Sequence, residues 1–168
     1  MKSGLVLDFE GCFSKGIREV GFIKIADFRI QQFSEIVLDE DNSNLIISEV
    51  LSENFDFFLS HKISVENNFI KTVMPYRKAN YRMNVKWGPW LDSREIYSVL
   101  YPNINKYDLK TLTKMFLDKN ELEKLSQHIC KDGKNKFHHP LYDALCTFLL
   151  VKRLENKVEL RKFLQVLQ

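Results

Sequence analysis

The order in which strand-like and helix-like segments follow one another constrains the fold of this chain more than any other feature. Three apolar, strand-like runs come first, at Leu5–Glu10, Val20–Ala26 and Ile30–Leu38, and their short connections favour an antiparallel meander. Helix-like and strand-like segments then alternate, namely Asn44–Leu51 (helix), Phe55–Ser60 (strand), Ser64–Val73 (helix) and Val85–Leu91 (strand). Because strands and helices mix along one short chain, the pattern predicts a layered α/β domain.

The remainder of the chain is predicted to be helical. Asp92 or Ser93 is expected to cap a helix that ends near Tyr101. Four further helices are expected, at Leu109–Leu117, Glu121–Ile129, Pro140–Leu154 and Lys157–Leu167. The leucine-rich stripes of the last two are interpreted as core or as the face of a homodimer. A length of 168 residues fits one domain, residues 1–168.

Composition excludes several classes of protein. Apolar residues make up 45% of the chain and charged residues 28%, as in ordinary soluble proteins. No apolar run approaches the roughly 20 residues that span a membrane, and the N-terminal run lacks the features of a signal peptide. The three scattered cysteines, Cys12, Cys130 and Cys146, are expected to be reduced thiols, which favours a cytoplasmic location.

Charge is distributed unevenly along the chain. Residues 30–61 contain no Lys or Arg but seven acidic residues, whereas residues 67–91 contain no acidic residue and five basic ones. The basic segment also contains aromatic residues. Solvated surface patches would account for such runs, but the basic segment is also suited to a polyanion such as nucleic acid.

Three pieces of the sequence carry acidic residues or histidines in suggestive places. Asp8 and Glu10 lie two apart on the first predicted strand, so their side chains share a face, where a hard divalent cation would relieve their repulsion. Glu66 falls in the first turn of a predicted helix. His138 precedes another helix, and Asp143 is expected to face out of that helix's first turn, which suits a mobile base beside a fixed ligand.

Together these pieces resemble the DEDDh 3′–5′ exonucleases of the ribonuclease-H-like superfamily, which include polymerase proofreading exonucleases, ribonuclease T and oligoribonuclease. Asp8-Phe9-Glu10 matches the first motif, and Glu19-Val20-Gly21 resembles a triplet that usually follows it. His61 to Glu66 aligns with the second motif, with Lys62 in place of Asn and Glu66 in place of Asp. His138 and Asp143 match the third motif, His-x4-Asp.

The resemblance implies a fold, an activity and a set of roles. The fold would be a ribonuclease-H-like three-layer α/β/α arrangement with a five-stranded mixed sheet. Asp8, Glu10 and Asp143 would hold one of two divalent cations, Mg²⁺ or Mn²⁺, with Asp8 bridging to a second cation supported by Glu66. His138 would deprotonate the attacking water, and the terminal phosphodiester at the 3′ end of single-stranded DNA or RNA would be hydrolysed to a nucleoside 5′-monophosphate.

Residues that bind the nucleic acid are expected in three places. The resemblance implies backbone contacts just after the first motif, and the start of the second motif is a further candidate. In the basic segment, aromatic rings would stack on bases and cations would contact phosphates. The expected nucleic-acid contacts are Gly11, Cys12, Phe13, His61, Lys62, Tyr76, Arg77, Lys78, Tyr81 and Arg82. The Trp87 and Trp90 side chains are more typical of a core.

Other interpretations stay open from the sequence. A fold that has lost catalysis would leave a nucleic-acid-binding or interaction module, although a binder gains little from so many repelling carboxylates. The substrate could also be a short oligonucleotide or a cyclic nucleotide. A zinc site at His128, Cys130, His138 and His139 matches no common spacing, and Cys12 has no evident base partner as a nucleophile.

Overall fold

A five-stranded mixed sheet forms the centre of the protein, as seen in a computed structural model that describes residues 1–12, 14–38, 43–51, 53–73 and 88–166. The strand order is β3-β2-β1-β4-β5. Strands β1 (Ser3–Cys12), β2 (Gly16–Ala26) and β3 (Arg29–Val37) form an antiparallel meander. β4 (Phe57–Ser60) pairs parallel to β1, and β5 (Trp90–Asp92) pairs parallel to β4.

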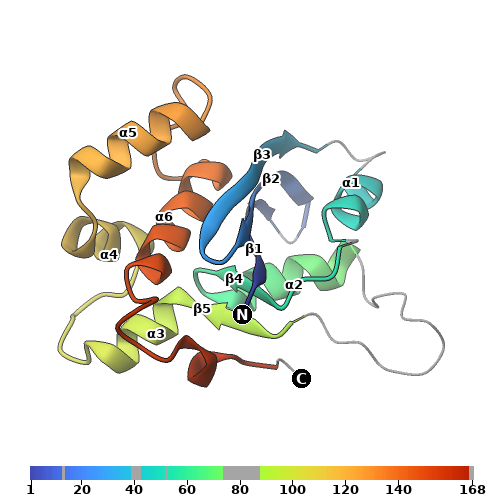
Figure 1. The fold of residues 1–168 in the computed structure, drawn as a ribbon. Coiled ribbons are helices and arrows are strands. Elements are labelled where there is room, and N and C mark those ends of the chain that lie inside the picture. Colours follow the sequence, from blue (N-terminus) through green and yellow to red (C-terminus); the bar gives the residue numbers. More distant parts are fainter. Residues whose placement is uncertain (13, 39–42, 52, 74–87, 167–168) are drawn as a thin grey trace.

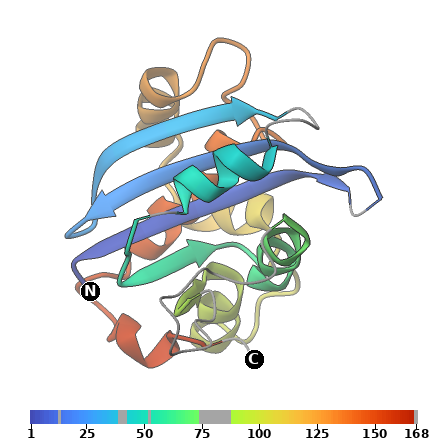
Figure 2. The same ribbon diagram turned by 90° about the vertical axis from the view of Figure 1, so that its right-hand side faces the viewer.

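Helices cover both faces of this sheet (Figure 1). On one side lie α1 (Ser43–Val50) and α2 (Ile63–Val73), and Figure 2 views the sheet from this side. On the other side α6 (Pro140–Lys152) packs against the sheet, with α3 (Ser93–Leu100), α4 (Leu109–Phe116) and α5 (Lys119–Ile129) beyond it. The three-layer α/β/α arrangement implied by the resemblance is therefore confirmed.

Two of the predicted elements, the last strand and the last helix, differ from the structure. β5 begins only at Trp90, and residues 85–87 of the predicted strand lie outside the described residues. The predicted last helix is a single 3₁₀ turn, Leu160–Phe163. Backbone hydrogen bonds of 2.8 and 2.9 Å between Trp90 and Gln165 hold the segment after this turn at the sheet edge, which ends the helix.

Within the described ranges, no helix combines the length and apolar character that a membrane span requires.

Alternation along β1 sends its side chains to two different cores. Leu5, Leu7 and Phe9 are buried on the α1–α2 side, where the Phe9 ring lies 6.1 Å from that of Phe69. Val6 is buried on the α6 side. Since successive side chains on a strand alternate between its faces, Asp8 and Glu10 follow Val6 onto the α6 side.

Gly21 lets the start of α6 approach the sheet closely. Gly21 lies on β2, between β1 and β3. It pairs with Asp8 of β1 on one side and with Glu35 of β3 on the other. A Cβ atom at this position would lie 2.2 Å from the backbone nitrogen of Leu141 and 2.2 Å from the carbonyl carbon of Pro140. Because Gly21 has no side chain, the first turn of α6 can pack directly against the sheet, and this distance between helix and sheet positions Asp143.

Replacing Gly21 with Ala is expected to lower the free energy of unfolding by about 1–3 kcal/mol, because backbone atoms of α6 must shift to admit the methyl group. Urea unfolding followed by circular dichroism measures this loss. Val37→Ala is the control, since Val37 is 65% exposed on the neighbouring strand and its loss should change stability by less than about 0.5 kcal/mol. An unfolding midpoint for Gly21→Ala equal to that of the wild type would contradict the close approach.

Candidate metal centre

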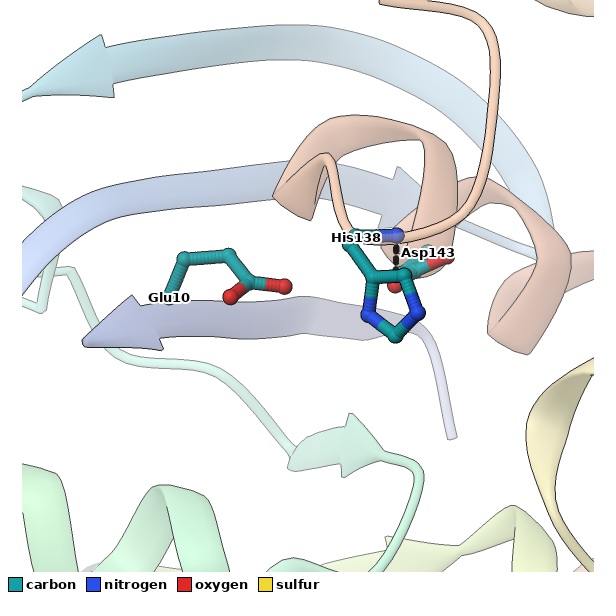
Figure 3. A group of neighbouring side chains, drawn as sticks. All are labelled: Glu10, His138 and Asp143. Atoms are coloured by element: carbon teal, nitrogen blue, oxygen red, sulfur yellow. Dashed lines mark hydrogen bonds between the residues drawn. The ribbon is translucent and has the colours of Figure 1, made fainter. Parts of the chain in front are cut away.

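Glu10, His138 and Asp143 come together at the end of β1 and the start of α6. One ligand atom of each residue lies within 4.8 Å of the others. Figure 3 shows the Glu10 carboxylate extending from β1 toward the His138 ring and the Asp143 carboxylate. Residues separated by more than a hundred positions thus meet because α6 packs across β1 and β2.

Asp143 is buried, which corrects the expectation that it faces outward from the first turn of its helix. Its exposed fraction is only 8%, because α6 lies with this turn against the sheet. One carboxylate oxygen, Oδ2, accepts a hydrogen bond of 3.1 Å from the backbone N–H of His138. The other, Oδ1, is buried and has no hydrogen-bond partner among the described residues.

Asp8 and Glu66 are not part of this 4.8 Å group, but the charge of Asp8 interacts with Glu66 as well as with Glu10 and Asp143, so we refer to the four carboxylates together as one acidic group. Burial is the main cause that raises the pKa of Asp8 well above its ordinary value, and the carboxylates of Glu66, Asp143 and Glu10 raise it further. Burial likewise raises the pKa of Glu66 to about 8 and that of Asp143 to about 7. Burial also raises the pKa of Glu10, while nearby His138 lowers it. Burial therefore raises the pKa of all four predicted acids, and the charge of Asp8 interacts with the charges of the other three.

The position of Glu66 depends on Asp92, whose full role the sequence did not reveal. Asp92 ends β5 and caps α3 as expected, accepting from the N–H groups of Arg94 and Glu95. The same carboxylate also accepts bonds of 3.0 Å from the N–H groups of Lys62 and Ile63, at the start of α2. One buried side chain thus joins two helix N-termini and fixes the turn that carries Glu66.

Two residues beside the acidic group have left-handed backbone conformations. Lys62, just before α2, has φ 71°, and His138, just before the cap of α6, has φ 68°. Neither is glycine, so each conformation costs on the order of 1 kcal/mol and must be held by surrounding contacts. The imidazole of His138 is exposed, at the open side of the acidic group.

Unlike the four acids, the residues expected to contact nucleic acid do not gather at one place within the described part of the chain. Gly11 and Cys12 are exposed at the end of β1, next to Glu10. The ring nitrogens of His61 lie 2.8 Å from Ser93 Oγ and 3.0 Å from the Tyr107 carbonyl, so this side chain joins β4 to α3 and the following loop. Phe13, Tyr76, Arg77, Lys78, Tyr81, Arg82 and Trp87 lie outside the described residues. Trp90 is fully buried.

A second group of potential ligand atoms exists beside the first, but its two carboxylates already pair with a lysine. Glu19, Glu35 and His139 have atoms within 4.8 Å of one another. The Lys134 ammonium donates to Glu35 and, at 3.4 Å, to Glu19. Among the described residues neither group of potential ligands includes a cysteine. The zinc arrangement of His128, Cys130, His138 and His139 is thus not assembled.

The acidic group has the chemistry of a site for a hard divalent cation. Its ligands are carboxylate oxygens with one imidazole, which suits Mg²⁺ or Mn²⁺. Two buried oxygens, Glu66 Oε2 and Asp143 Oδ1, have no hydrogen-bond partner among the described residues, and such atoms are costly to bury unless something else satisfies them. A cation would supply that partner and favour the charged carboxylates, whose pKa values are raised mainly by burial.

The three-layer α/β/α architecture is consistent with a ribonuclease-H-like fold, and the acidic group lies at the end of β1 and the start of α6. Among solved structures, the chain is similar to exonuclease X in complex with 5′-overhanging duplex DNA, with a TM-score of 0.64 and 16% sequence identity. The similarity covers 97% of this chain and 98% of that one, so it extends over the whole fold. No protein-family model and no curated protein sequence matches the chain.

The raised pKa values predict how stability depends on pH without metal. Burial holds the pKa of Glu66 near 8 instead of its ordinary 4.5, so the folded state binds this proton more tightly than the unfolded state. The stability that protonated Glu66 contributes to the folded state is fully present below pH about 4 and is lost as pH rises through about 8. In EDTA, Glu66→Gln should therefore match the wild type in free energy of unfolding near pH 5 and exceed it near pH 9, by on the order of a few kcal/mol.

Denaturant unfolding at a series of pH values measures this difference between the two proteins. Glu121→Gln, at an exposed glutamate on α5, is the control and should show a difference from wild type that does not grow with pH. Adding Mn²⁺ at pH 9 should stabilise the wild type more than Glu66→Gln. A gap that stays constant with pH would mean that Glu66 is not protonated in the metal-free protein.

Proposed function

We propose that the protein is a metal-dependent 3′–5′ exonuclease, with residues 1–168 acting as one exonuclease domain. The observation that carries the proposal is the convergence of Glu10, His138 and Asp143 from β1 and the start of α6, with Asp8 and Glu66 beside them. Likeness of the fold to an exonuclease supports the same reading. The substrate would be the 3′ end of single-stranded DNA or RNA, and the product a nucleoside 5′-monophosphate.

Each acid has a role that fits its position. Asp8, Glu10 and Asp143 would hold one divalent cation, and Asp8 with Glu66 would hold the second. When bound, such a pair activates water and neutralises charge on the leaving oxygen. The exposed imidazole of His138 lies within 4.8 Å of the Glu10 and Asp143 ligand atoms, so a ring nitrogen can accept the proton of a water bound there.

The two departures from the second motif fit this arrangement. Glu66 is 3% exposed, and its charge raises the pKa of Asp8, which supports a place for the longer carboxylate near the proposed centre. The Lys62 charge lowers the pKa of Glu66, although burial outweighs it. Lys62 would add a cation beside the site that can contact a substrate phosphate.

Binding of the strand would use two regions. Gly11 and Cys12 are exposed beside Glu10 and would contact the terminal nucleotide through the backbone. The acid-free segment of residues 67–91 would supply the stacking rings of Tyr76 and Tyr81 and the cations Arg77, Lys78 and Arg82.

Asp8→Asn and Asp143→Asn should each abolish cleavage without unfolding the protein, because an amide has nearly the same shape but lacks the charge that a metal requires. The assay uses 5′-labelled single-stranded DNA and RNA in parallel, with Mn²⁺, with Mg²⁺ and with EDTA. The wild type should shorten one or both from the 3′ end only when metal is present. Thermal unfolding in EDTA should show both variants at least as stable as the wild type, since each removes a repelling carboxylate.

The pattern of products separates the proposal from other functions. Cleavage that persists in EDTA or in Asp8→Asn would overturn the metal mechanism. Cleavage from the 5′ end or within the strand would overturn the direction. Tight binding of the oligonucleotide with no cleavage under any condition would identify a nucleic-acid-binding module instead.

His138→Ala should slow turnover by roughly 10²–10⁴-fold, as expected for loss of a general base. Calorimetric titration with Mn²⁺ should show that metal affinity is largely kept, because the carboxylates remain. Asp143→Asn serves as the contrasting variant, in which metal affinity should fall as well. A parallel loss of metal affinity in His138→Ala would make His138 a ligand and not the base.

A further inference from the structure

The segment that carries His138 is tied at both ends to one carboxylate. Glu35 Oε1 accepts a hydrogen bond from the Lys134 ammonium, and Glu35 Oε2 accepts a bond of 3.4 Å from the backbone N–H of Leu141. Lys134 lies four residues before His138, and Leu141 lies three residues after it. Glu35 therefore closes an eight-residue loop, counted from 134 to 141, around the proposed base.

This anchor is placed deep in the structure, unlike ordinary surface ion pairs. The Glu35 side chain is only 2% exposed, and that of Lys134 is 28% exposed. Lys134 also contacts Glu19 of β2 at 3.4 Å, and hydrogen bonding to Glu35 is the main cause that raises the pKa of Lys134. A buried carboxylate that lost its cation would be left uncompensated, so this pair is held in place more strongly than an exposed one.

The position of Glu35 follows from the sheet. It pairs across the strands with Gly21, which in turn pairs with Asp8. Because Gly21 has no side chain, the backbone of Pro140 and Leu141 lies over the middle of this row. The start of α6 is thus held between the acid of the proposed centre on one side and Glu35 on the other.

His138 itself has few contacts that would place its ring. Its imidazole is exposed and its backbone has φ 68°, a conformation that relaxes unless neighbouring contacts hold it. The contacts that hold the backbone are the N–H bond to Asp143 Oδ2 and the flanking ring contact of Phe137 with Tyr142, at 5.3 Å between centroids. The direction of the ring therefore depends on the loop around it.

We propose that Glu35 and Lys134 are positioning residues, whose ion pair holds the loop of residues 134–141 so that His138 reaches the water it deprotonates. This inference rests on the proposed exonuclease function for its catalytic consequence, but the anchoring of the loop is measurable without activity. It assigns a function to two residues that touch neither substrate nor metal.

The first test compares kinetics of Lys134→Met, Glu35→Gln and Lys134→Arg. The first two should lower kcat by about ten- to a hundredfold, as for a small displacement of a catalytic group, with KM and Mn²⁺ affinity nearly unchanged. Lys134→Arg keeps the charge and should retain most activity. Lys131→Met is the matched control, because it removes a charge from an exposed position three residues before the loop and should leave kcat near the wild-type value.

The second test places Lys134→Met in the His138→Ala background. If Lys134 acts through His138, the double variant should be no slower than His138→Ala alone. If Lys134→Met lowers kcat in the His138→Ala background by the same factor as in the wild type, the proposal is overturned, and Lys134 has a role that is independent of His138. A fall in Mn²⁺ affinity that accounts for the lost activity would overturn it equally, by pointing to Asp143 and the metal.

Amide hydrogen exchange separates failure of this inference from failure of the proposed function. Peptides covering residues 131–141 should exchange faster in Lys134→Met and Glu35→Gln than in the wild type, and at the wild-type rate in Lys131→Met. This result should hold in EDTA and without substrate. Unchanged exchange in both anchor variants would overturn the anchor, whereas a wild type without nuclease activity would overturn the proposed function alone.

Discussion

The electrostatic cost of packing Asp8, Glu10, Glu66 and Asp143 around one point is the constraint on which the rest of the structure depends. Burial is the main cause that raises the pKa of each of them, and repulsion from others of the four adds to it for Asp8 and Asp143. Left to themselves, four carboxylates would separate or take up protons. They stay together because β1, the first turn of α2 and the first turn of α6, which carry them, are fixed by packing elsewhere. A bound cation would lower the free-energy cost of keeping these charges together.

The scaffold fixes these acids by satisfying backbone groups from both sides of the sheet. On the α2 side, Asp92 gathers N–H groups from two helix N-termini and so fixes the turn before Glu66. On the α6 side, Glu35 and the bare Gly21 hold the start of the helix that carries Asp143. Asp92 and Glu35 hold backbone segments in place, through hydrogen bonds and, for Glu35, an ion pair with Lys134. The four acids of the proposed centre are also carboxylates, but their proposed role is to bind a cation. Their environments, and not their chemical type, separate the two roles.

Much of this arrangement was predictable from local pattern. Apolar runs and turn residues along the chain gave the strand order of the meander and the main helices, and the Asp-x-Glu spacing placed two acids on one face of β1. Both depend only on the periodicity of a strand or a helix. The short 3₁₀ turn at Leu160–Phe163 was missed because its conformation is set by pairing of Gln165 with Trp90, a contact between distant residues. The outward orientation expected of Asp143 was wrong for the same reason, since the surface its turn faces belongs to the sheet.

The sequence by itself determined which residues are candidates for the proposed chemistry, because carboxylates, histidines and their spacings are properties of the chain. Only the tertiary structure decided which of them meet and in what state. Parallel pairing of β4 with β1 and the crossing of α6 over the sheet join Glu66, Asp143 and Asp8, and their pKa values follow from that burial. Glu35 and Lys134 are separated by 99 positions and carry no motif, so their ion pair beneath the His138 loop exists only once the sheet and α6 have packed.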